Sequence, residues 1–246
     1  MKEKLAGINS IMEALKGRRK IEKILVQENR QGKRMAELLQ LAGKKGVYVQ
    51  TVEKTRLDKL YTIGNHQGII ALVDAYQYST LEEVLEYAAL RREDPLLVIL
   101  DGIEDPGNFG AIVRTAEGAG VHAIIIPRHN SVPVNETVGR ASAGAIEYMH
   151  VVQAANLVNT MKMLKEKGFW IIGADMDAAS SYFEASIPVP AVVVIGGEGK
   201  GLRRLVKENC DLLVKIPMQG KLGSLNASVA AALLLYEVVR QRANDQ

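Results

Sequence analysis

Apolar residues in the second half of the chain form short continuous runs instead of alternating with polar residues. Such runs are typical of strands that are buried on both faces of a parallel sheet. Helical spacing lies between most of these runs, so the pattern predicts an α/β domain with a parallel sheet and helices on both faces. The expected strands are 95–100, 123–127, 169–174, 191–196 and 212–217, and the expected helices are 108–119, 135–143, 156–167, 202–209 and 226–242.

The first third of the chain has a different pattern, with shorter strands around one amphipathic helix. Strands are expected at 21–26, 47–52 and 68–76, and helical spacing over 33–46 ends at a glycine. These elements predict a second, smaller α/β unit.

A polar, charged segment separates the two patterns. Within it, Thr80 and Glu83 have the spacing of a capping box for a helix over 81–91. We therefore divide the chain into a first unit, a linker and a sheet domain, at 1–77, 78–94 and 95–246.

Charge divides the chain in a similar way. Residues 1–77 hold 15 Lys and Arg against 8 Asp and Glu, a net charge of +7. Residues 78–246 hold 16 against 20, a net charge of −4. A basic unit joined to a mildly acidic one favours binding of a nucleic acid through the basic unit, although a solvated surface rich in lysine would carry the same charge.

The composition argues against several classes of protein. The one cysteine, Cys210, cannot form an internal disulfide, which suits a reducing cytoplasm. The N-terminal residues lack an apolar signal segment, and the longest apolar run, 229–236, is far shorter than the ~20 residues of a membrane span. The four histidines show neither metal-ligand spacing nor pairing with Cys210, so we expect no metal and no catalytic triad.

Three strand-to-helix turns hold the unusual polar residues, and ligands of parallel sheets bind where strands end. In the first turn, 100–120, Asp101 ends a buried strand and Asn108 suits a helix N-cap. Arg114 follows within an apolar helical stretch. It is either a salt-bridged helix residue or a guanidinium that binds a phosphate or carboxylate.

The second turn, IGGEGKGL (195–202), contains glycines that let backbone N–H groups approach a ligand closely. It is not a P-loop, because Gly201 follows Lys200 where Ser or Thr is needed, and it is not a dinucleotide fingerprint, because Leu202 falls at the third glycine. Its one acidic residue, Glu198, is expected to make a polar contact.

The third turn, IPMQGKLGSLNASVAA (216–231), leads into the last helix. Ser224 and Asn226 both suit the N-cap of that helix.

In this order, the three turns resemble the motifs of the SpoU (TrmH-like) branch of the SPOUT RNA methyltransferases. The resemblance covers about residues 95–242. The first unit resembles, more loosely, the substrate-binding domain of 23S rRNA guanosine 2′-O-methyltransferases of the RlmB type, which is similar to a ribosomal-protein-like RNA-binding fold. The matching segments are NFGAIVR (108–114), GGEG (196–199), IPMQG (216–220), SLNAS (224–228), GINSIMEAL (7–15) and HQGIIALV (66–73).

The resemblance implies S-adenosylmethionine-dependent 2′-O-methylation of a guanosine in 23S rRNA by a homodimer whose active site is completed across the interface. It also implies a trefoil knot in the last part of the sheet domain, a feature too rare among folds to be inferred from periodicity. The residues at catalytic positions would be Asn108, Arg114, Glu198, Ser224 and Asn226, and those at cofactor positions Gly196, Ile216, Met218 and Leu225.

The motif-one arginine has been proposed as the catalytic base in related enzymes. Guanidinium groups remain protonated in proteins, so we expect Arg114 to bind the target phosphate instead. Two alternatives remain from the sequence. One is a tRNA 2′-O-methyltransferase of the same family, which shares every catalytic motif. The other is an RNA-binding assembly factor without catalysis, which the intact motifs disfavour.

Overall fold

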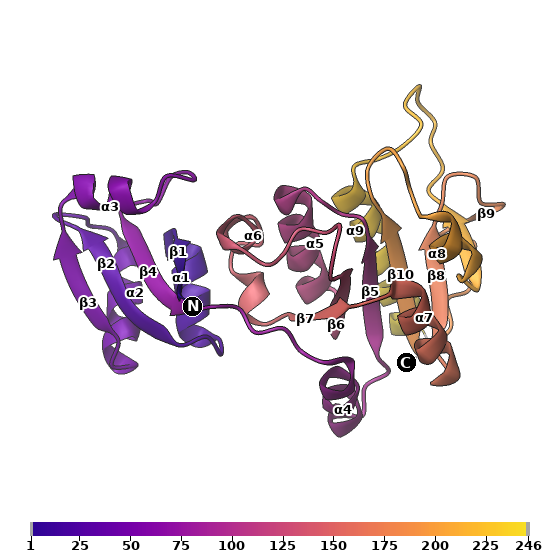
Figure 1. The fold of residues 1–246 in the computed structure, drawn as a ribbon, viewed down its shortest axis with the longest axis horizontal. Coiled ribbons are helices and arrows are strands. Elements are labelled where there is room, and N and C mark those ends of the chain that lie inside the picture. The colour runs from indigo at the N-terminus through magenta and orange to yellow at the C-terminus, as the bar shows by residue number, and fades with distance from the viewer. Residues whose placement is uncertain (1, 245–246) are drawn as a thin grey trace. The chain divides into compact units, whose positions relative to one another are not determined.

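A computed structural model describes residues 2–244 and divides the chain into two compact units (Figure 1). The first unit consists of Met1–Gln77 and Pro133–Tyr148, and the second of Tyr78–Val132 and Met149–Gln246. The elements of the first unit are β1 (Lys2–Ala6), α1 (Ile8–Lys16), β2 (Ile21–Gln27), α2 (Lys33–Lys44), β3 (Tyr48–Val52), α3 (Lys54–Leu60), β4 (Ile69–Asp74), α6 (Glu136–Ala141) and η1 (Ala145–Glu147). Those of the second unit are α4 (Leu81–Arg91), β5 (Leu96–Asp101), α5 (Pro106–Gly118), β6 (Ala123–Pro127), β7 (His150–Ala154), α7 (Leu157–Glu166), β8 (Trp170–Ala174), β9 (Ser180–Ser181), β10 (Ala191–Gly196), α8 (Arg204–Glu208), β11 (Leu212–Lys215) and α9 (Ala227–Asn244).

The second unit is built on a seven-stranded parallel sheet in the order β7-β6-β5-β10-β8-β11-β9. All five strands expected from continuous apolar runs are present, so the parallel α/β prediction is confirmed. The pattern missed β7 because its residues, HVVQA, include two polar side chains, and it missed β9 because that strand has only two residues.

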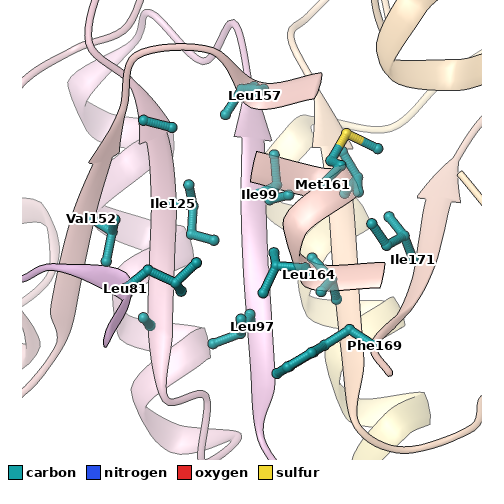
Figure 2. Packing of buried hydrophobic residues seen from close by; sticks show 14 of the residues in the cluster. Leu81, Leu97, Ile99, Ile125, Val152, Leu157, Met161, Leu164, Phe169 and Ile171 are labelled. Carbon is teal, nitrogen blue, oxygen red and sulfur yellow. The ribbon is translucent and has the colours of Figure 1, made fainter. Parts of the chain in front are cut away.

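Helices cover both faces of this sheet. On one face, Met161 and Leu164 of α7 pack over Leu97 and Ile99 of β5 (Figure 2). Leu81 of α4 belongs to the same buried cluster. Neighbouring residues of β5 point to the opposite face, since successive strand side chains alternate, and there α9 packs against α5 and β10.

The first unit has a four-stranded mixed sheet in the order β1-β4-β2-β3, in which β2 and β3 are parallel and β4 is antiparallel to its neighbours. Apolar residues of α1 and α2 cover one face of this sheet, and Leu57 of α3 with Tyr61 covers the other. The three strands expected here are all present, and β1 adds an edge strand.

Residues 133–148 lie with the first unit, whereas the sequence division placed them in the sheet domain. Helix α6 packs against β1, and Ser10 Oγ donates a hydrogen bond to the carbonyl oxygen of Gly139 at 3.4 Å. The apolar pattern of a short helix marks which face is buried but not which core buries it.

The segment 78–94 also differs from a plain linker, because the predicted helix α4, with its capping box between Thr80 and Glu83, is packed into the second unit. A truncation of 1–77 would therefore strip α6 of its packing partners.

A buried ion pair holds the segment 133–148 to the rest of the first unit. Arg19 Nε lies 3.2 Å from Glu147 Oε2, and Arg19 also donates to Glu3 Oε2 at 2.9 Å. The side chains of Arg19 and Glu147 are only 7% and 2% exposed. Burial raises the pKa of the Glu147 carboxyl, and the positive charge of Arg19 opposes that rise.

Replacing Arg19 with methionine is expected to destabilise the first unit by about 3 kcal/mol at neutral pH, because it leaves a carboxylate buried without its cation. A carboxyl whose pKa is raised by folding loses stability as pH rises through that pKa. The loss should therefore shrink as the pH falls and Glu147 is protonated. Urea unfolding followed by hydrogen exchange in β1 and α6 measures the effect, and a loss that does not depend on pH would contradict this explanation.

Candidate active site

Asn108 does not cap its helix, contrary to the sequence-based expectation. Helix α5 begins at Pro106, and its N-cap is Asp105, three residues before Asn108. The Asp105 carboxylate accepts the backbone N–H of Asn108 at 2.6 Å. Proline suits a first helical position because its missing N–H would have no partner there. The amide side chain of Asn108 is therefore free to make other contacts.

Asn108, Glu198 and Asn226 form a hydrogen-bonded cluster. Asn108 Nδ2 donates to Glu198 Oε1 at 2.7 Å, and Asn226 Nδ2 donates to the same oxygen at 2.9 Å. Asn226 Nδ2 also donates to Asn108 Oδ1 at 2.9 Å. The three residues come from the turns that follow β5, β10 and β11, so the cluster joins all three motif turns.

The orientation of the two amides follows from the backbone. Asn226 immediately precedes α9, and its Oδ1 accepts the N–H and the hydroxyl of Ser228 at 2.9 and 2.6 Å. This oxygen must be an acceptor, so Nδ2 of Asn226 faces the other two residues. Asn226 thus caps the helix as expected, and the same side chain also holds the cluster. The predicted polar contact of Glu198 is present.

The glycine turn after β10 is packed backbone to backbone on two sides. A Cβ atom on Gly196 would lie 2.3 Å from the carbonyl carbon of Gly201, and one on Gly197 would lie 2.4 Å from the carbonyl oxygen of Gly102. No larger residue fits at either position without moving the backbone. The turn is closed by a hydrogen bond from the N–H of Gly201 to the carbonyl of Gly197 at 3.0 Å.

Asp101 anchors this turn, a role that the sequence did not reveal. Its side chain is buried, and its two oxygens accept the backbone N–H of Arg203 at 2.8 Å and the Arg203 Nε at 2.6 Å. Its carbonyl accepts the N–H of Gly197 at 2.9 Å. The available signal was an aspartate at the end of an otherwise apolar strand, where an unpaired carboxylate would be costly.

The third turn leaves backbone groups open. Within the described residues 2–244, the N–H groups from 218 to 225 have no hydrogen-bond partner. Ile216 and Met218 are half-buried, and Leu225 is 36% exposed. Ser224 is exposed and is not the N-cap. This turn offers free backbone donors beside apolar side chains.

Arg114 lies on α5, almost two turns beyond Asn108, and is exposed. It forms no salt bridge with any residue that the structure describes, which removes the simpler explanation of a paired helix arginine. The structure brings Asn108, Glu198 and Asn226 together, but among the residues it describes no hydrogen bond or salt bridge joins Arg114 or Ser224 to them.

Other reactive side chains lie outside the cluster. Burial raises the pKa of the Cys210 thiol to about 12, so this thiol stays protonated at neutral pH. His122 is buried against Glu93, and its burial lowers its pKa. The described part of the chain contains no group of three side chains suited to hold a metal ion, and none of its helices combines the length and apolar character of a bilayer span.

Two protein-family models match the chain. The model described as the SpoU rRNA methylase family matches residues 95–236, which contain all three motif turns and α9 as far as Tyr236. The model described as RNA 2′-O ribose methyltransferase substrate binding matches residues 4–79.

Relatives and solved structures agree with the two family matches. The Bacillus subtilis protein YacO, whose name places it in the TrmH family of tRNA/rRNA methyltransferases, is 44% identical over 236 residues, which are 96% of this chain and 94% of that protein. The SpoU methyltransferase AviRb from Streptomyces viridochromogenes, in complex with the cofactor AdoMet, has a TM-score of 0.81 and 25% identity, covering 99% of this chain and 91% of AviRb. The TrmH/SpoU tRNA modifying enzyme of A. aeolicus has a TM-score of 0.57 and 28% identity, covering 66% of this chain and 86% of that enzyme.

Proposed function

This chain belongs to the SpoU family of RNA 2′-O-ribose methyltransferases, which use S-adenosylmethionine, and we propose that it methylates a guanosine ribose in 23S ribosomal RNA. The observation that carries the proposal is the cluster of Asn108, Glu198 and Asn226, which joins the three motif turns by hydrogen bonds. The ribosomal target is supported by the basic first unit. The match to the A. aeolicus tRNA modifying enzyme covers only 66% of this chain, so about a third of the chain has no counterpart in that match.

The residues at the second and third turns fit S-adenosylmethionine. The open backbone N–H groups between 218 and 225 can donate to its polar atoms, and Met218 and Leu225 offer apolar surface beside them. Gly196 is the last residue of β10, and Ile216 directly follows β11. We assign Gly196, Ile216, Met218 and Leu225 to cofactor binding.

S-adenosylmethionine supplies a methyl group on a sulfonium sulfur. In the proposed reaction, the ribose 2′-oxygen forms a bond to that methyl carbon, the carbon–sulfur bond breaks, and the hydroxyl proton passes to solvent. Arg114 is assigned to bind the phosphate beside the target ribose and, by its positive charge, to favour loss of the proton. The cluster of Asn108, Glu198 and Asn226 fixes the relative positions of the turns, since misplacement of reacting groups is costly. Ser224 lies in the same turn and is assigned to contact the substrate.

We propose a cytoplasmic homodimer as the working form. Arg114 is exposed and lies almost two turns of α5 away from the cluster. In a dimer, Arg114 of one chain would complete the active site of its partner. Helix α9 exposes Val229 and Tyr236, at 46% and 53%, and is the proposed centre of that interface. The trefoil knot around the second and third turns likewise stays a prediction.

The proposal is tested by transfer of labelled methyl groups from S-adenosylmethionine to unmodified 23S rRNA transcripts, with unmodified tRNA alongside and ribose methylation mapped afterwards. We expect one 2′-O-methylguanosine in 23S rRNA. Label only in tRNA would overturn the ribosomal target in favour of a tRNA enzyme, and cofactor binding without transfer to either RNA, or to assembling ribosomal particles, would favour a non-catalytic factor.

A further inference from the structure

The first unit contains a polar pocket of about 430 Å³. It lies between the end of β2, the start of α3 and the loop 64–68. None of the catalytic or cofactor residues assigned above lines it. Its volume falls within the range of about 300–1,000 Å³ that is typical of pockets for small organic groups.

Internal hydrogen bonds hold the wall of this pocket in place. His66 is buried, and its Nδ1 accepts the backbone N–H of Gly68 at 3.0 Å. Its Nε2 must therefore carry the proton, and it donates to Asp58 Oδ1 at 2.8 Å. The carbonyl oxygens of His66 and Gly68 accept the N–H groups of Ile69 and Gln27. The loop is thus preformed rather than shaped by a ligand.

Amide groups of the loop present hydrogen-bond donors. Asn65 Oδ1 accepts the N–H of Gln67 at 2.7 Å, and Gln67 Oε1 accepts the N–H of Ile8 at 3.2 Å. Because both amide oxygens are used within the protein, the NH₂ groups of these side chains remain as donors. Such donors suit the acceptor atoms of a nucleic-acid base, for example O6 and N7 of guanine.

Positive charge lines the same pocket. Arg30 and Lys54 are exposed at it, and Asp58 is its one acidic residue, already bonded to His66. The stem of Arg30 lies over Gly68, where a Cβ atom would be 3.2 Å from its Cδ. This contact directs the guanidinium of Arg30 to the pocket. A guanidinium binds phosphate well and can stack on a base.

We propose that this pocket binds one unpaired nucleotide of the RNA substrate, other than the one that is methylated. Arg30 and Lys54 bind its phosphate, and the amides of Gln27, Asn65 and Gln67 bind the edge of its base. A paired base within an A-form helix could not enter such a pocket, so the substrate element is a loop or bulge rather than a continuous duplex. This inference rests on the proposed function, because it takes the ligand to be the RNA that the enzyme methylates.

The test measures binding of unmodified 23S rRNA and tRNA transcripts, with a fully paired RNA duplex of equal length as competitor. Arg30→Gln removes the charge, and Gln27→Met removes an amide of similar size that makes no side-chain hydrogen bond with any residue that the structure describes. Lys45→Gln is the matched control, because Lys45 is exposed on the same unit and does not line the pocket. Thermal unfolding of each variant checks the fold.

Arg30→Gln is expected to weaken binding about tenfold and to lower the slope of log affinity against log salt by about 1. Gln27→Met should weaken binding without changing that slope, and should reduce the preference for the transcript over the duplex. Lys45→Gln should stay within about twofold of the wild-type affinity.

Wild-type affinity in both pocket variants would overturn the inference, even if methyl transfer to 23S rRNA confirmed the proposed function. An Arg30→Gln effect with no Gln27→Met effect would reduce the pocket to a phosphate contact and would also overturn it. Conversely, if the wild-type chain methylated neither transcript, the variant affinities for the 23S transcript would still decide whether the pocket binds an unpaired nucleotide.

Discussion

Replacement of Arg114 with lysine is expected to lower kcat for methyl transfer about 100-fold while leaving the affinity for S-adenosylmethionine nearly unchanged. A planar guanidinium can donate two parallel hydrogen bonds to a phosphate, whereas an ammonium acts as a compact charge. Loss of one well-placed donor to a developing charge costs about 100-fold or more in kcat. Steady-state kinetics with the mapped RNA substrate and calorimetric titration of the cofactor separate the two quantities.

Arg204→Lys is the matched control, because Arg204 is an exposed arginine outside the motifs, paired with Glu208 at 2.6 Å. Near-normal turnover of Arg114→Lys would refute the assignment of a phosphate contact through two hydrogen bonds.

A mixed dimer tests whether Arg114 acts in its own chain or in the partner's active site. One chain with Arg114→Lys and one with Asn226→Ala should regain activity that neither homodimer has, if Arg114 acts in the partner's site. If the mixed dimer stays inactive, Arg114 acts within its own chain.

Replacement of Gly196 with alanine is expected to weaken S-adenosylmethionine binding at least about 100-fold. The added Cβ would lie 2.3 Å from the carbonyl carbon of Gly201, so the backbone of the turn must move. Displacement of site groups by about 1 Å can cost about 100-fold in function. Binding is measured by isothermal titration, and methyl transfer should fall in parallel.

The control is Gly43→Ala in α2, outside the motif turns, where a Cβ meets no atom within 4 Å. This variant should bind the cofactor within about twofold of wild type, because the substitution itself causes no overlap. Circular dichroism and hydrogen exchange in β5 and β6 must show that Gly196→Ala keeps its sheet. Full cofactor affinity in a folded Gly196→Ala chain would show that this turn does not form the cofactor site.

The strands of the large sheet could be predicted because a strand buried on both faces needs apolar residues throughout, whatever it packs against. The candidate site could be predicted as a set of turns for a related reason. Parallel strands end at a common edge, where ligands bind, and the resemblance implies that Asn108, Glu198 and Asn226 share one site although up to 118 residues separate them. Their hydrogen bonds were not predictable, because side-chain contacts depend on where each helix begins. The sequence predicts Asn108 as an N-cap, and only the start of α5 at Pro106 frees its amide for Glu198.

The sequence by itself determined the parallel α/β class, the basic first unit and the three turns that hold the proposed site residues, because local periodicity, charge and motif spacing are properties of the chain. Only the tertiary structure decided that residues 133–148 pack with the first unit, that Asp101 anchors the glycine turn, and that a donor-lined pocket forms beside His66. Each of these depends on contacts between residues far apart in the chain. A buried polar group needs a partner, but the sequence alone does not say which distant residue supplies it.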